Sequence, residues 1–147
     1  MKKIFLFITI SALTLTGCSS DGGSSTSRIT MKVDGVSRTF GDIELIEEPM
    51  SLDGVEYTYV NVIAENTNNP DQYIVFDFYR SELDTDELTE FRFYDGASES
   101  YATFSGDTFT SLIDINTSER AKGTFSGTLQ GDQVLTITNG SFDIRFE

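Results

Sequence analysis

Short stretches in which apolar and polar residues alternate, separated by turn-forming pairs, run through most of this 147-residue chain. Residues 29–33 alternate up to Asp34-Gly35, and residues 36–40 alternate beyond that pair. An Asp-Gly pair suits a type I′ hairpin turn, because both central residues of that turn need a positive φ. The pattern therefore predicts a β-hairpin in which Val33 lies opposite Val36.

The same alternation predicts an all-β domain of about nine or ten short antiparallel strands. We expect these strands to form a two-sheet sandwich, with a small up-and-down, lipocalin-like barrel as the alternative. One short helix is expected within residues 81–90, where Ser81 or Thr85 suits an N-cap. Beyond the first hairpin, strands are expected at residues 43–48, 55–64, 72–80, 91–94, 101–104, 109–116 and 122–130.

The C-terminal stretch VLTITNGSFDIRFE, residues 134–147, carries a second strong turn signal. Asn-Gly is a favoured type I′ pair, so the sequence predicts a hairpin turn at Asn139-Gly140. Ile137 would then face Phe142 across the hairpin, with one face of the pair in the core and the other in water.

The N-terminus has the layout of a secretory signal peptide. Lys2 and Lys3 precede an uncharged apolar run at residues 4–15, and a basic start followed by a short apolar segment is typical of such peptides. As a helix this run would measure roughly 18 Å, well below the ~30 Å of a bilayer core. We therefore expect a segment that is removed, and not a permanent membrane span.

The segment Leu15-Thr16-Gly17-Cys18 resembles the bacterial lipobox. The resemblance implies cleavage before Cys18, acylation of that cysteine with palmitate-type chains, and anchoring in a membrane. Ser19 after the cysteine favours the outer membrane by the same resemblance. The alternative is an ordinary signal peptide with an incidental cysteine. The expected organisation is a signal peptide at 1–17, a lipidated cysteine with a Ser/Gly tether at 18–27, and an all-β domain at 28–147.

Composition excludes several chemistries. The chain has 24 acidic and 10 basic residues, a net charge of −14, no histidine and one cysteine. So acidic a surface repels nucleic acid, which we exclude as a partner. The lack of histidine excludes Ser-His-Asp catalysis and imidazole metal sites. We therefore expect no catalytic residues, although a small hydrolase using paired carboxylates stays as a second alternative.

One acidic segment offers oxygen ligands that suit a hard cation such as Ca²⁺. Leu88 and Thr89 interrupt the pattern of an EF-hand loop, so the alternative is a solvated acidic loop. No other cofactor is expected. The candidate ligands are Asp84, Asp86, Glu87 and Glu90.

Alternation also gathers tyrosines and polar residues on one strand face. Tyr57 and Tyr59 share a face of one expected strand, and Tyr73, Asp77 and Tyr79 share a face of the next. Aromatic rings stack on the apolar faces of sugars, and carboxylates bind hydroxyl groups, so neighbouring strands would form a glycan-binding surface. The alternative is cross-strand tyrosine pairing that covers a second core face.

The C-terminal stretch GTFSGTLQGDQVLTITNGSFDIRF is similar to small Gram-negative surface lipoproteins built from an all-β domain of unknown function. The resemblance includes the lipobox and the hairpin from Ile29 to Gly35, and it implies an all-β fold at the cell surface without catalytic residues. We therefore expect a lipid-anchored, non-enzymatic binding or structural domain of the envelope, with a glycan or an envelope protein as its partner. Capture of a small ligand inside a closed barrel is an alternative.

Overall fold

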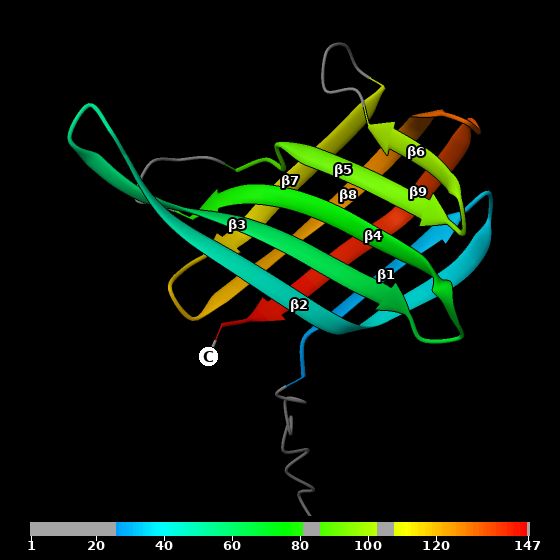
Figure 1. Ribbon diagram of the computed structural model, residues 1–147, viewed down its shortest axis with the longest axis horizontal. Helices are drawn as coiled ribbons and strands as arrows, with labels where there is room; N and C mark the ends of the chain where they lie inside the picture. Colours follow the sequence, from blue (N-terminus) through cyan, green and yellow to red (C-terminus); the bar gives the residue numbers. More distant parts are fainter. Residues whose placement is uncertain (1–25, 81–85, 103–107, 147) are drawn as a thin grey trace, which may run out of the picture.

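The computed structural model describes residues 26–80, 86–102 and 108–146, and within them it is all antiparallel β-structure without a helix. The expected all-β class is thus confirmed. The helix expected within 81–90 is absent from residues 86–90, and residues 81–85 lie outside the described part. The strands are β1 (Arg28–Val33), β2 (Val36–Leu52), β3 (Val55–Asn66), β4 (Asn69–Arg80), β5 (Glu90–Asp95), β6 (Ser98–Ala102), β7 (Phe109–Asn116), β8 (Arg120–Gly131) and β9 (Leu135–Arg145) (Figure 1).

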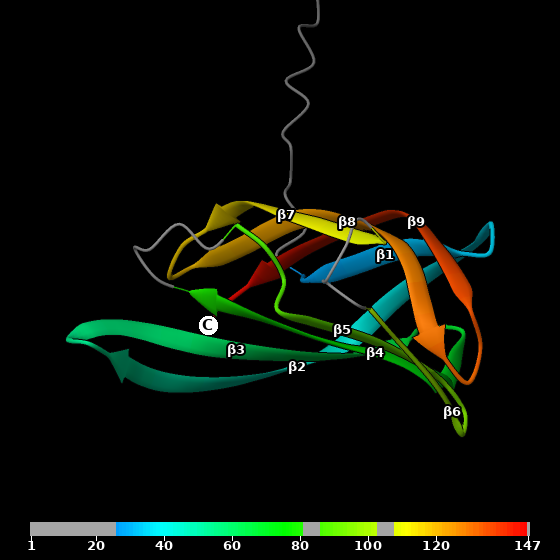
Figure 2. The ribbon, with the colours of Figure 1, turned by 90° about the horizontal axis from the view of Figure 1, so that it is seen from above.

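These strands close into a barrel. Their order is β6-β5-β4-β3-β2-β1-β9-β8-β7, and β6 also pairs with β8. The β6–β8 pairing closes eight strands into a ring and leaves β7 as an extra strand beside β8. The expected sandwich is therefore not confirmed, and the barrel alternative fits. The barrel nevertheless resembles a sandwich, because it is flattened into a layer of β2–β5 and a layer of β1 and β7–β9 (Figure 2).

The first hairpin forms as predicted. Asp34 has φ 47° and Gly35 has φ 80°, and these positive angles are those that a type I′ turn needs. Val33 pairs with Val36. The local sequence is enough to predict this turn, because a type I′ turn matches the twist of the two strands and favours an Asp-Gly pair.

The predicted turn at Asn139-Gly140 is wrong. Strand β9 runs unbroken through both residues, and the β8–β9 connection lies at residues 132–134. Asn139 instead has φ 53° within a β-bulge, where β9 carries one more residue than its neighbours. The extra residue shifts the alternation by one, so both Ile137 and Phe142 point into the barrel.

Gly140 follows the bulge because an aromatic ring occupies the place of its side chain. A Cβ at Gly140 would lie 2.4 Å from two ring carbons of Phe125 and 2.5 Å from the Phe125 carbonyl oxygen. The Asn-Gly pair therefore serves a bulge and a close packing contact, two roles whose local sequence signal is the same as that of a turn.

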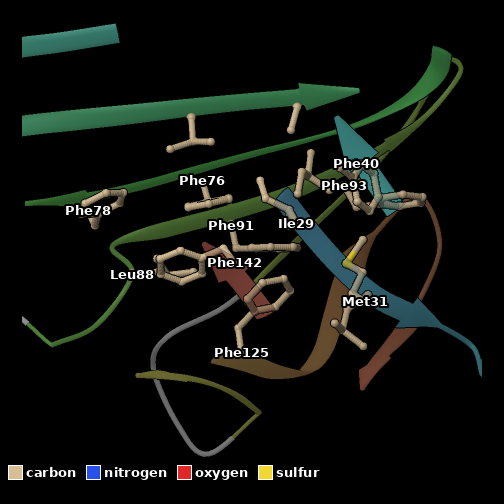
Figure 3. Packing of buried hydrophobic residues seen from close by; sticks show 14 of the residues in the cluster. Ile29, Met31, Phe40, Phe76, Phe78, Leu88, Phe91, Phe93, Phe125 and Phe142 are labelled. Atoms are coloured by element: carbon tan, nitrogen blue, oxygen red, sulfur yellow. The ribbon is translucent and has the colours of Figure 1, made fainter. Parts of the chain in front are cut away.

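Aromatic side chains fill the barrel interior (Figure 3). Phe76 of β4 meets Phe142 of β9 at a centroid distance of 5.3 Å, and Phe91 of β5 meets Phe125 of β8 at 4.8 Å. Rings from opposite walls are thus in contact across the middle of the barrel. Phe76 and Phe91 have no exposed area. These side chains occupy the middle of the barrel, where a lipocalin-type ligand would have to lie.

Candidate functional site

Three tyrosines of β3 and β4 gather on the outer face of the sheet, away from the barrel interior. Tyr59 pairs directly with Tyr79, and their ring centroids lie 5.7 Å apart. Tyr57 meets Tyr79 edge to face, with centroids 5.3 Å apart and planes at 88°. This geometry is a favoured one for aromatic pairs. We call Tyr57, Tyr59 and Tyr79 the tyrosine cluster; each is partly exposed.

Asp77 holds one member of the tyrosine cluster, Tyr59, in place. Its Oδ2 accepts a hydrogen bond from the Tyr59 hydroxyl at 2.5 Å, and its Oδ1 accepts one from Asn61 Nδ2 at 2.5 Å. The residue is only 3% exposed although it lies on the outer face. Burial, followed by the hydrogen bond to Asp77, raises the pKa of Tyr59 well above that of a free tyrosine. Asp77 therefore fixes the position of Tyr59 and Asn61, and each of its two oxygens accepts one of these hydrogen bonds.

Tyr73, which the sequence placed in the same group, lies apart from the tyrosine cluster. Its ring stacks on Tyr94 of β5, with centroids 4.4 Å apart and planes at 8°. The Tyr94 hydroxyl donates to Glu99 Oε1 at 3.0 Å. Burial, then the neighbouring Tyr94, raises the pKa of Tyr73. Sequence reasoning named Tyr73 but not Tyr94, because only the β4–β5 register places these two residues opposite each other.

The acidic candidates for a cation site are not gathered in the described part of the chain. Asp84 lies outside it, and Asp86 and Glu87 are exposed to solvent. Glu90 forms an ion pair with Arg92. Within residues 26–80, 86–102 and 108–146, no three His, Cys, Asp or Glu side chains come together in a metal-binding arrangement.

An open groove of about 750 Å³ lies at the end of the barrel where the β2–β3 hairpin extends beyond the other strands (Figure 1). Tyr57 is among its lining residues, so the groove adjoins the tyrosine cluster. Arg80 also lines the groove; it is paired with Glu47, and its guanidinium carbon lies 4.3 Å from the centroid of the Phe146 ring. The other lining residues are Pro49, Gly54, Val55, Glu56, Thr58, Asn116, Thr117 and Ser118.

The residues that predict lipidation, including Cys18, lie outside the described residues. Among those that are described, no helix has the length and apolar character needed to cross a membrane. Comparison with known proteins identifies no matching family model, no matching curated protein and no matching solved structure.

Proposed function

We propose that this chain is a lipid-anchored lipoprotein of the cell envelope, located at the outer membrane, whose barrel is a non-enzymatic module that binds glycans on its outer surface. The single observation that carries the binding role is the tyrosine cluster. All three rings are partly exposed, and those of Tyr57 and Tyr59 lie 5.3 and 5.7 Å from the Tyr79 ring, centroid to centroid. The Asp77 carboxylate fixes the Tyr59 ring through a hydrogen bond.

The chemistry of the cluster suits sugars. Aromatic rings offer flat apolar surfaces that pack against the C–H faces of pyranose rings, and their hydroxyl groups bind sugar hydroxyls at the edge. Tyr59 is held by Asp77, so little side-chain entropy is lost on binding. Because Asp77 is buried and hydrogen-bonded to Tyr59 and Asn61, it acts as a positioning residue and the rings make the contact with the glycan.

A glycan array probed with the labelled full chain tests this proposal. We expect binding to a subset of glycans, and a loss of about tenfold in affinity for Tyr79→Ala, because an aromatic stacking contact contributes about 1.5 kcal/mol. Tyr101→Ala is the matched control, since Tyr101 is 47% exposed and outside the tyrosine cluster. An array without binding, or equal losses for both variants, would contradict the proposal.

The proposed lipid anchor at Cys18 and its location at the outer membrane need a separate test. Metabolic labelling with palmitate should mark the wild-type chain and leave Cys18→Ala unlabelled, and the label should fractionate with the outer membrane. Absence of label on the wild type would overturn the anchor, while the glycan-binding proposal would stand on its own measurement.

A further inference from the structure

We propose that residues 42–48 of β2 are a docking edge where an extended, basic segment of another protein adds as a further β-strand. Strand β2 pairs with β3 from Phe40 to Leu52, but with β1 only from Val36 to Phe40. Beyond Phe40, no described strand pairs with the other edge of β2. Figure 1 shows this stretch as the last strand of the front layer. We call residues 42–48 the open edge.

An unpaired edge presents a row of backbone N–H and C=O groups that an extended peptide can bind. The open edge has natural limits at both ends. At its start the register of β2 shifts between Gly41 and Ile43, and Asp42 has φ 42°. At its far end is Pro49, which has no N–H to donate to an added strand. The peptide that fits is therefore about seven residues long.

Side chains along the open edge define the chemistry of the partner. Glu44, Ile46 and Glu48 alternate on the outer face and are exposed, Ile46 by 41%. Ile43 and Leu45 point the other way and pack against the core. Cross-strand neighbours favour opposite charges and apolar pairs. A matching strand carries basic residues opposite Glu44 and Glu48, an uncharged residue opposite Ile46, and apolar residues on the inner side, where Glu47 is already paired with Arg80.

The charges of the open edge disfavour symmetric pairing with a second copy of this chain. Antiparallel pairing of two such edges centred on Ile46 places Glu44 directly opposite Glu48 at two positions. Like charges placed directly opposite each other destabilise a sheet. The acidic residues thus prevent self-association, as charged edge strands commonly do, while they attract a basic strand.

Binding of a capped, labelled peptide, Thr-Lys-Val-Thr-Val-Lys-Thr, to the full chain tests the proposal by fluorescence anisotropy. Two isomers of this peptide carry N-methyl groups on alternate backbone nitrogens, one set on each edge of the strand. Both isomers keep the charge, but only one keeps the N–H groups that face the open edge. We expect one isomer to bind like the parent and the other to lose at least about tenfold. Equal binding of both isomers would show plain charge attraction and overturn the proposal.

A pair of charge-matched double variants locates the site. Glu44→Lys with Glu48→Lys should weaken peptide binding about tenfold or more, because two favourable cross-strand pairs become repulsive. Asp114→Lys with Asp132→Lys, which changes two exposed acids on β7 and in the β8–β9 connection by the same charge, should change the affinity less than about twofold. Equal effects of the two double variants, or dimerisation of the wild type in sedimentation without peptide uptake, would contradict the proposal.

Discussion

The two faces of β3 and β4 use aromatic residues in opposite ways. On the inner face, Phe76 and Phe78 have no exposed area and meet rings from the opposite wall. On the outer face, one residue further along the same strand, the Tyr79 ring is partly exposed and packs against the rings of Tyr57 and Tyr59. The interior of this barrel is packed with rings from both walls, whereas the outer face leaves aromatic surface accessible to solvent, which is why we propose that binding occurs there.

Truncating an inner ring should have the largest effect. Phe76→Ala removes a fully buried ring and should lower the free energy of unfolding by about 3–5 kcal/mol. Phe76→Leu is the milder control, and Tyr79→Ala the outer counterpart, which should cost less than half as much. Urea denaturation compares the three. Equal costs for Phe76→Ala and Tyr79→Ala would show that the tyrosine cluster is a second core face and not a binding surface.

The glycine of the bulge comes next. Gly140→Ala places a methyl group against the ring and carbonyl of Phe125, and this overpacking should cost about 3 kcal/mol. Thr138→Ala, at an exposed position of the same strand, should cost less than about 0.5 kcal/mol. Thermal unfolding measures both. A neutral Gly140→Ala would mean that the inner face tolerates added volume and is not tightly packed.

Sequence alone predicted which residues lie on the inner and outer faces, but it did not predict that the sheet closes into a barrel. Alternation correctly separated Phe76 and Phe78 from Tyr79, because period-two patterning is a local property of a strand. The turn at Asn139-Gly140 was mispredicted, because a bulge and a turn share the same residue preferences. The choice between sandwich and barrel depended on the β6–β8 pairing, which joins Tyr101 to Gln130. No local pattern encodes so distant a pairing.

The candidate site shows the same limit. The sequence correctly grouped four residues on one face, because β3 and β4 are consecutive and alternation shows which side of each strand a residue occupies. These residues are Tyr57, Tyr59, Asp77 and Tyr79. The engagement of Asp77 by two neighbours was not predictable, since it depends on side-chain geometry. Tyr73 has the right parity, but its partner comes from a third strand.

Removing the hydroxyl group of Tyr59 should lower the free energy of unfolding by an intermediate amount. Tyr59→Phe leaves one oxygen of the buried Asp77 without its partner and should cost about 1.5 kcal/mol. The raised pKa of Tyr59 adds a pH dependence, because the unfolded chain releases this proton near pH 10 and the folded chain keeps it. Stability should therefore fall above about pH 10 in the wild type and less steeply in Tyr59→Phe. Parallel pH profiles would contradict the anchored hydroxyl.

The ion pair between Arg120 of β8 and Asp143 of β9 should contribute least to the free energy of unfolding. Arg120 donates from Nε to Asp143 Oδ1 at 2.7 Å and from Nη2 to Oδ2 at 2.5 Å, and its hydrogen bonds lower the pKa of Asp143. A lowered pKa stabilises the fold above the unfolded value near 4, and this contribution is lost as the pH falls further. Asp143→Asn should thus cost less than about 1 kcal/mol at pH 7 and nothing near pH 2. A cost that persists at pH 2 would point to packing instead.

Our proposal that this barrel binds glycans on its outer face is tested most directly by chemical-shift mapping. The isotope-labelled full chain is titrated with the tightest-binding glycan of the array. We expect shifts centred on the amides of Tyr57, Tyr59 and Tyr79, with Ile137 and Phe142 on the opposite wall unchanged. Shifts centred on Ile137 and Phe142, which would show a ligand entering the barrel, would contradict it.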